Sequence, residues 1–562
     1  MTERPWVATY PKHVVWDQKI PVKPLYDLVA DAAQEFPDHV AYDFMGATLT
    51  YRDFLDQVNR MAKGLQDSGV GKGCHVGIFM PNCPQFVVAY FGILKAGGTV
   101  VNYSPLYAEH ELIQQVEDSE TDIMITLNLT ALYPMIHAVA RKSRLKHLVV
   151  DDFASTLPFP KNILFRLFKN NMIAKVVKDK YYVNYEQLLQ NDGMPSLVTI
   201  NPEEDVAVIQ YTGGTTGVPK GAMLTHSNIY SNVVQLKEWA IDIEPGKEIV
   251  LGCLPFFHVF AMTVVMDLSI YLGAKVVIQP KFQLDEAIKM MKKEKPTLFA
   301  GVPTMFTALI NHKLSPNIGM DSIKVCMSGG APLPVELGQA FKSKMNVTIS
   351  EGYGLTETSP VCVSNPFDRE TRKGSIGLPI PATEVIIVDR KDPTKIMPLG
   401  ENGEICIRGP QVMKGYWKNP QATDEVMING MLRTGDVGYM DEEGFTYIID
   451  RDKDLILVGG FNVYPRVVEE AIYEHPAVHE VTVIGIPDDY LGECPKAFVT
   501  LKNPEETLTE EDLMAFIKDR LGKHERPKQI EFRAELPKSM IGKLSKKELV
   551  AEEKEKYEQG KA

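Results

Sequence analysis

The sequence is short of the features that define several classes of protein. It has only 7 cysteines in 562 residues, and they are scattered singly without a C-x-x-C pair. An odd number of isolated cysteines argues against a disulfide framework and a zinc site, and it predicts a reducing compartment. Basic residues are outnumbered, since 60 lysines and arginines face 73 aspartates and glutamates and leave a net charge of −13. A nucleic acid is therefore not expected as the main partner, because phosphate binding favours a basic face.

Long apolar runs are also missing. No stretch reaches about 18 uncharged apolar residues, the length that a membrane-spanning helix needs, because Lys95, Asp267 and Lys275 interrupt the best candidates. The first residues, Met-Thr-Glu-Arg-Pro-Trp, lack the apolar centre of a signal peptide. We therefore expect a cytoplasmic protein. Its length predicts more than one domain, since a single core seldom extends beyond about 300 residues.

The sequence does have a loop rich in glycine and threonine near its middle. Residues 211–226 read Tyr-Thr-Gly-Gly-Thr-Thr-Gly-Val-Pro-Lys-Gly-Ala-Met-Leu-Thr-His and lie between two short apolar strands. Glycines let backbone N–H groups converge on an anion, threonines add hydroxyl donors and the lysine adds charge. The Walker A pattern does not fit, because a proline precedes the lysine. We predict a phosphate-binding loop that is not a Walker A loop.

Strands and helices alternate along most of the chain. The alternation runs from 76 to 150 and resumes from 251 to 351, which predicts an α/β fold with two doubly wound βαβ subdomains. From about 360 short alternating strands with many glycines predict a small β-barrel-like subdomain. A charge cluster then precedes a compact α+β segment. We place the domain boundary there, with an N-terminal domain over 1–451 and a C-terminal domain over 452–562.

Residues 157–180 differ from their surroundings. They combine six lysines and arginines with one acidic residue and many Leu, Phe, Ile and Val side chains. This composition is typical of an interfacial helix attracted to anionic lipid. The alternative is a surface helix that packs on its own domain.

Further motifs follow the glycine-rich loop in a set order. They are Gly329-Gly-Ala, Glu351-Gly-Tyr-Gly-Leu-Thr-Glu-Thr358, Arg433-Thr-Gly-Asp436 and Leu536-Pro-Lys-Ser-Met-Ile-Gly-Lys543. Together with the loop they resemble the signature motifs of the adenylate-forming superfamily, which contains acyl-CoA synthetases, peptide-synthetase adenylation domains and beetle luciferases. Within it the chain most resembles bacterial long-chain fatty-acid–CoA ligases. The family usually has an arginine three residues after the final lysine, where this chain has Lys546.

The resemblance implies a role for each of these motifs. Tyr353 would stack on adenine, Asp436 would accept hydrogen bonds from the ribose hydroxyls, and Glu357 would be the carboxylate ligand of Mg²⁺. Taken singly, such residues have ordinary alternatives: a core tyrosine, a turn aspartate or, for His258, a structural histidine. The implied ATP- and AMP-binding residues are Thr212, Gly213, Gly214, Thr215, Thr216, Gly217, Lys220, Gly330, Ala331, Pro332, Tyr353, Gly354, Thr356, Asp436, Arg451 and Lys543.

The resemblance also implies the remaining parts of the site. Lys543 would be the catalytic lysine of a small, mobile C-terminal domain, because its charge can neutralise the anionic groups that meet in the reaction. The implied catalytic residues are Lys543, Thr212, Lys220 and His258. The implied acyl pocket contains His258, Val259, Gly329 and Gly354. The implied hinge is Lys453, and the implied CoA-binding residues are Gly459, Gly460 and Phe461.

The function implied by the resemblance is that of a long-chain fatty-acid–CoA ligase using ATP, Mg²⁺ and coenzyme A. No acidic residue lies between Pro255 and Met266, where amino-acid-activating relatives hold an ammonium group, so a plain carboxylic acid is expected. Two alternatives stay open: a medium-chain or aryl-CoA ligase, and a non-catalytic fatty-acid-binding protein at the membrane. Similar segments in bacterial ligases favour a transient contact of residues 157–180 with the anionic inner face of the plasma membrane. A homodimer also stays open.

Overall fold

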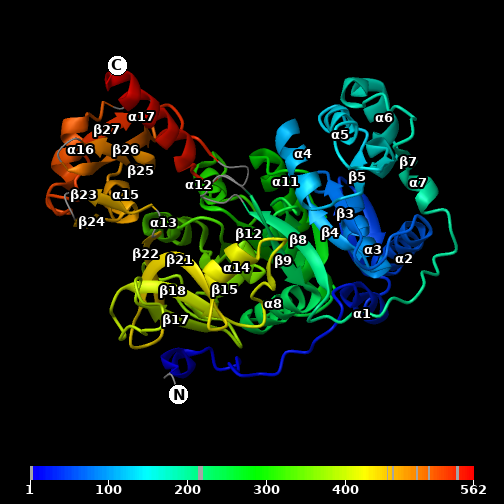
Figure 1. Ribbon diagram of the computed structural model, residues 1–562, viewed down its shortest axis with the longest axis horizontal. Coiled ribbons are helices and arrows are strands. Elements are labelled where there is room, and N and C mark those ends of the chain that lie inside the picture. The colour runs from blue at the N-terminus through cyan, green and yellow to red at the C-terminus, as the bar shows by residue number, and fades with distance from the viewer. Residues whose placement is uncertain are drawn as a thin grey trace.

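Four sheets organise the part of the chain that the computed structural model describes (Figure 1). That part comprises residues 4–212, 219–451, 454–458, 461–488, 491–503, 507–538 and 543–561, with the backbone alone at 451, 461, 462, 560 and 561. The predicted α/β fold is confirmed, with a large N-terminal domain of mainly parallel sheets and a smaller C-terminal domain.

The first large sheet has eight strands in the order β19-β9-β8-β4-β3-β5-β6-β7. Its middle strands pair in parallel, whereas β8 and β9 are antiparallel. The predicted phosphate loop therefore joins two neighbouring strands near one edge of this sheet. The strands are β3 (His75–Phe79), β4 (Thr99–Asn102), β5 (Ile123–Leu127), β6 (His147–Asp151), β7 (Tyr182–Asn184), β8 (Val206–Thr212), β9 (Lys220–Thr225) and β19 (Gly415–Tyr416).

The second large sheet has nine strands in the order β16-β15-β14-β13-β12-β10-β11-β1-β2. Its parallel part places β13 and β14 side by side, which brings the glycine-rich turn after β13 next to the glycine-rich motif within β14. The strands are β1 (Val40–Phe44), β2 (Ala47–Thr50), β10 (Ile249–Gly252), β11 (Lys275–Ile278), β12 (Leu298–Gly301), β13 (Val325–Ser328), β14 (Ser350–Gly354), β15 (Val361–Ser364) and β16 (Leu378–Pro379).

The helices of the large domain begin and end where local chemistry predicts. The hydroxyl of Thr50 accepts a hydrogen bond from the Asp53 amide at 3.2 Å and caps α2, while α3 starts at Pro84 and ends at Gly97, whose φ is 89°. The helices are α1 (Asp27–Glu35), α2 (Tyr51–Asp67), α3 (Pro84–Ala96), α4 (Glu109–Asp118), α5 (Tyr133–Ala140), α6 (Lys161–Phe168), α7 (Tyr185–Leu188), α8 (His226–Trp239), α9 (Val259–Ala261), η4 (Met262–Asp267), α10 (Leu268–Tyr271), α11 (Leu284–Glu294), α12 (Pro303–Asn311), α13 (Val335–Met345) and α14 (Pro420–Val426).

The predicted β subdomain is a five-stranded antiparallel sheet beside the second large sheet. It contains β17 (Glu384–Val388), β18 (Gly403–Arg408), β20 (Met427–Ile428), β21 (Met431–Met440) and β22 (Thr446–Arg451). The motif that ends in Asp436 lies within β21, next to β22 in the register Asp436↔Arg451. The sheet thus delivers this motif to the face that meets the C-terminal domain.

The C-terminal domain forms its own sheet and core (Figure 1, orange to red). One described core cluster of the chain ends at Phe445, and another runs from Ile456 to Ile530. The boundary between 451 and 452 stays a prediction. The elements are β23 (Ile456–Val458), β24 (Phe461–Val463), β25 (Val478–Asp488), β26 (Gly492–Leu501), β27 (Gln529–Phe532), α15 (Pro465–Tyr473), α16 (Glu510–Ile517) and α17 (Lys546–Lys561).

Candidate active site between the two domains

A cavity of about 470 Å³ lies where the C-terminal domain meets the large domain. The large domain contributes the turn after β13, residues of β14 and Asp436 of β21, and the small domain contributes α15 and the segment before α17. Several residues singled out from the sequence line this cavity together: Gly330, Ala331, Pro332, Tyr353, Gly354, Asp436 and Lys543. Motifs far apart in the sequence are therefore brought to one place.

Tyr353 and Asp436 form a hydrogen-bonded pair in this cavity. The Tyr353 hydroxyl donates to Oδ2 of Asp436 at 2.6 Å, although the two residues belong to different sheets. Burial, followed by the negative charge of Asp436, raises the pKa of Tyr353 well above its usual value, so the phenol stays protonated and remains a donor. The Asp436 amide donates to Oγ1 of Thr434 at 3.0 Å, which fixes the turn that presents the carboxylate.

The glycine-rich turn after β13 is held close to its neighbours. A side chain at Gly329 would approach the ring of Phe260 to 2.8 Å, and Gly330 has a φ of 76°. Oε1 of Glu351, at the start of β14, accepts a hydrogen bond from the Leu333 amide at 3.0 Å. The turn thus forms a fixed wall of the cavity.

Lys220 and Glu357 both lie against Tyr416, a residue that the sequence did not single out. The Tyr416 hydroxyl donates to Oε1 of Glu357 at 2.7 Å, and the Lys220 ammonium lies 5.2 Å from the centroid of the Tyr416 ring. Thr212 and Lys220 face each other across β8 and β9, and Thr356 precedes Glu357 in a short 3₁₀ helix. Tyr416 reaches this place because β19 pairs with β9, a contact for which the sequence spacing holds no signal.

Some predicted residues lie outside the described part of the chain. They are Gly213, Gly214, Thr215, Thr216 and Gly217 of the phosphate loop, Lys453 of the hinge, and Gly459 and Gly460 of the CoA segment. For Arg451 and Phe461 the structure describes the backbone, which places Arg451 opposite Asp436 and Phe461 at the start of β24.

His258 and Lys543, two predicted catalytic residues from different domains, lie within electrostatic range of each other. Burial, followed by the positive charge of Lys543, lowers the pKa of His258 to about 4. The imidazole is therefore neutral near pH 7, and its Nδ1 accepts a hydrogen bond from the Phe260 amide at 3.3 Å. Val259 follows at once and is buried.

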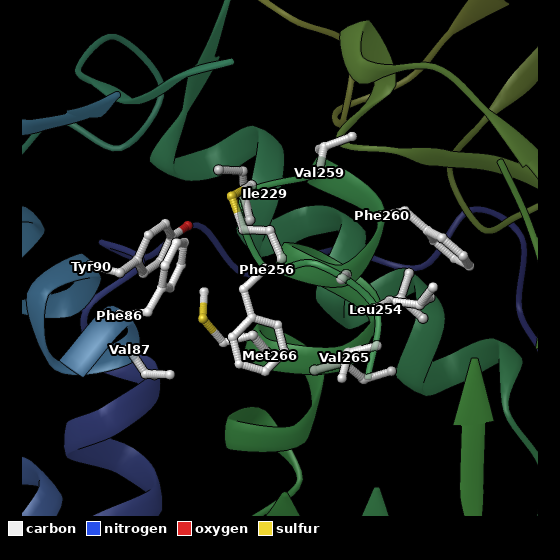
Figure 2. Packing of buried hydrophobic residues seen from close by; sticks show 14 of the residues in the cluster. Phe86, Val87, Tyr90, Ile229, Leu254, Phe256, Val259, Phe260, Val265 and Met266 are labelled. Atoms are coloured by element: carbon white, nitrogen blue, oxygen red, sulfur yellow. The ribbon is translucent and has the colours of Figure 1, made fainter. Parts of the chain in front are cut away.

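The segment after His258 is a buried π-helix, η4, which sequence periodicity did not predict. π-Helices are rare in proteins, and those that do occur are often found at functional sites. Figure 2 shows the apolar core around it, where Phe86 and Tyr90 of α3 point toward Phe256 and Met266. The rings of Phe86 and Phe256 lie 6.0 Å apart between centroids. The segment after His258 is thus packed within an apolar interior.

The segment 157–180 is not one long helix, which corrects the expectation of an interfacial helix over its length. Only Lys161–Phe168 is α-helical, and a short 3₁₀ turn follows at Asn170–Met172. The ring of Phe165 packs on Phe153 at 5.2 Å, so α6 does contact its own domain. Several large apolar side chains point to solvent nonetheless, with exposed fractions of 79% for Phe159, 68% for Leu167 and 75% for Phe168.

No described helix is both long and apolar enough to cross a membrane. Within the described residues there is also no group of three or more His, Cys, Asp or Glu side chains arranged to hold a metal ion.

Two family models match the chain: AMP-binding enzyme over residues 29–417, and AMP-binding enzyme C-terminal domain over residues 467–543. The chain belongs to the AMP-binding enzyme family. Within this family it is 43% identical to a long-chain-fatty-acid–CoA ligase of Bacillus subtilis strain 168, over 99% of both chains.

Two crystal structures of MatB from Rhodopseudomonas palustris, each 27% identical to this AMP-binding enzyme, differ in how well they superpose on it. The ATP-bound structure gives a TM-score of 0.82, covering 94% of this chain and 98% of MatB. The apo structure gives 0.74, covering 95% and 99%. Over the whole chain, the structure therefore superposes better on the ATP-bound relative than on the apo form.

Proposed function

We propose that the protein is a long-chain fatty-acid–CoA ligase, which converts a fatty acid, ATP and CoA into acyl-CoA, AMP and pyrophosphate through an acyl-adenylate. The observation that carries this proposal is the interdomain cavity, which Lys543 lines together with the hydrogen-bonded Tyr353–Asp436 pair, while His258 lies within electrostatic range of Lys543. The 43% identity to a long-chain-fatty-acid–CoA ligase over the full chain supports it.

ATP would lie in the cavity with its adenine along the turn Gly330-Ala331-Pro332 and against Tyr353 and Gly354. The Asp436 carboxylate would accept hydrogen bonds from the ribose hydroxyls, with Arg451 nearby. The phosphates would lie toward Thr212, the loop 213–217, Lys220 and Thr356. The shared lining of one cavity and the Tyr353–Asp436 hydrogen bond support this placement.

Magnesium would enter as part of the Mg·ATP substrate. Glu357 is suited to it, since one carboxylate oxygen accepts from Tyr416 and the side chain is only half-buried. A carboxylate held in this way is the hard oxygen ligand that Mg²⁺ prefers. Tyr416 would orient the carboxylate, and its ring would place Lys220 toward the same phosphates.

In the first reaction an oxygen of the fatty-acid carboxylate attacks the α-phosphorus of ATP. The bond from that phosphorus to the bridging oxygen breaks, and pyrophosphate leaves. Two anionic groups meet in this step, so the Lys543 ammonium would neutralise charge that builds up in the transition state. His258, neutral near pH 7, would orient the carboxylate at the mouth of an acyl pocket that includes Val259, Gly329 and Gly354.

In the second reaction the CoA sulfur attacks the acyl carbonyl carbon, the carbon–oxygen bond to phosphate breaks, and AMP leaves. We propose that the C-terminal domain rotates about Lys453 between the two reactions. Gly459, Gly460 and Phe461 would then lie beside the pantetheine arm of CoA. One pocket would thus serve both reactions.

The test is pyrophosphate release that depends on the carboxylic acid. With ATP and CoA present, palmitate should give a higher kcat/KM than octanoate, and cinnamate should give the lowest. An apolar pocket discriminates by only about 1–3 kcal/mol per methylene, so activity over a range of chain lengths is expected. Cinnamate as the best substrate would favour an aryl-CoA ligase, and no release with any acid would contradict the proposal.

We also propose that the enzyme works in the cytoplasm at the inner face of the plasma membrane, held there by the 157–180 segment. The exposed Phe159, Leu167 and Phe168 lie among six cations, which suits an anionic lipid surface. A homodimer remains a prediction that light scattering can test.

A further inference from the structure

Arg466 occupies an unusual place for a cation. It is the second residue of α15, at the end of the helix where the backbone dipole favours negative charge. Its side chain is only 11% exposed and lines the interdomain cavity. A buried guanidinium at this end of a helix requires compensation by nearby carboxylates.

Those carboxylates come from both domains. From the large domain, Oδ2 of Asp450 accepts a hydrogen bond from the Arg466 amide at 2.7 Å, and Glu351 lines the same cavity. From α15 itself, Oε1 of Glu470 accepts from Nε of Arg466 at 3.0 Å. Burial works to lower the pKa of Arg466, but the charges of Glu351, Glu470 and Asp450 outweigh it and keep the group charged.

Carboxylates near Arg466 also contact two parts of the proposed active site. Glu351 holds the Leu333 amide at 3.0 Å and so fixes the turn proposed to bind adenine. On the other side, Glu469 of α15 pairs with the Lys546 ammonium at 3.1 Å, three residues after Lys543. Lys543 is thereby tied to α15, and α15 is tied to the large domain.

We propose that Arg466 is a positioning residue for the adenylation reaction. Its side chain lines the interdomain cavity together with Glu351 and Asp450 of the large domain, and it holds α15 in the orientation that brings Lys543 within electrostatic range of His258. Arg466 itself touches no reacting atom in this proposal. The inference rests on the proposed ligase function and adds to it a residue that acts in one half-reaction.

The test compares the two half-reactions in Arg466→Met, which keeps much of the side-chain volume and removes the charge. Adenylation is followed as pyrophosphate release with palmitate and ATP in the absence of CoA. Thioester formation is followed as acyl-CoA made from supplied palmitoyl-AMP and CoA. We expect adenylation to fall by about 10- to 100-fold, the range of coupling within one charge network, while thioester formation changes by less than a factor of about three.

Four further variants sharpen the test. Arg466→Lys keeps the charge but loses the planar fork, so it should recover part of the adenylation rate. Glu351→Gln should lower adenylation less than Arg466→Met, and the double variant should be no slower than Arg466→Met alone. Arg533→Met is the matched control, because it removes an arginine that pairs with Glu531 and Glu552 in the same domain but away from the cavity. Its two half-reactions should remain equal to those of the unaltered enzyme.

Two results would overturn the inference: unchanged adenylation in Arg466→Met, or an equal loss of both half-reactions in that variant. A failure of the ligase function itself is distinguishable, because the unaltered enzyme would then release no pyrophosphate in response to palmitate.

Discussion

The cations of the interdomain cavity and those of the 157–180 segment have opposite surroundings. Arg466 is 11% exposed and lines a cavity with carboxylates of both domains, whereas Arg166 on α6 is 54% exposed and pairs with Asp152. None of the α6 residues is buried. Both regions are rich in lysine and arginine, so composition does not separate them. Burial and the number of nearby carboxylates distinguish the two regions.

The difference assigns different kinds of work to the two regions. A buried charge with several partners is costly to leave unpaired, so it can fix one geometry. An exposed cation with few partners contributes little to stability and remains available to an external anionic surface. We therefore expect changes in the cavity to alter catalysis, and changes in the 157–180 segment to alter location.

The largest effect should come from charge reversal in the segment. Replacing Lys161, Arg166, Lys169 and Lys175 with Glu removes four attractions of about 1 kcal/mol each, so binding to anionic vesicles should weaken by about 10³-fold or more. Vesicle co-sedimentation measures this binding. The turnover of octanoate, which does not need a membrane, should be unchanged.

A matched control carries the same change in charge elsewhere. Lys289, Lys292, Lys293 and Lys295 lie on and just after α11 and are all exposed. Their replacement by Glu should leave more vesicle binding than the segment variant does. Equal loss in both variants would mean that net charge, and not the 157–180 segment, governs binding.

The second effect lies in the cavity. Lys543→Ala removes the ammonium beside His258, so adenylation should fall by about 10²-fold, as when one preorganised electrostatic group is lost. Pyrophosphate release without CoA measures that step. The same variant should still convert palmitoyl-AMP and CoA into palmitoyl-CoA, and an equal loss in this second assay would contradict the alternation of the domain between two reactions.

Much of the fold could be predicted from local patterns. The apolar runs 76–80 and 206–209 are strand signals in the sequence, and they lie in β3 and β8 except for Met80. Thr50 followed by Asp53 is a helix-capping signal, and α2 begins directly after Thr50. Long-range pairing could not be predicted. β1 precedes the first alternation in the chain yet pairs with β11 of the second sheet, because strand partners are chosen by packing between distant segments and not by order.

The site shows the same limit. Motif spacing singled out Tyr353 and Asp436, which lie 2.6 Å apart between their oxygens, but it gave no sign of Tyr416, whose role depends on the pairing of β19 with β9.

The 157–180 segment shows a further limit. Proline 160 precedes α6, and Asn170 and Asn171 follow it; these residue types favour turns, and they flank a helix that is shorter than the composition suggested.

The smallest effect concerns the contact between the two domains at His258. Because burial and the Lys543 charge together lower its pKa to about 4, His258 should show no titration between pH 8 and pH 5.5 in NMR spectra of the histidine-labelled enzyme. Lys543→Ala removes a positive charge that disfavours the imidazolium, so the pKa of His258 should rise in that variant. It should stay below 6.5, because burial is the larger cause and remains.

His226 is the control: its pKa is also lowered to about 4, by burial, but Lys543 is not among its charged neighbours. Its signal should be the same in both proteins. An ordinary titration of His258 near pH 6.5 in the unaltered enzyme would mean that in solution the C-terminal domain does not rest over the acyl side of the site.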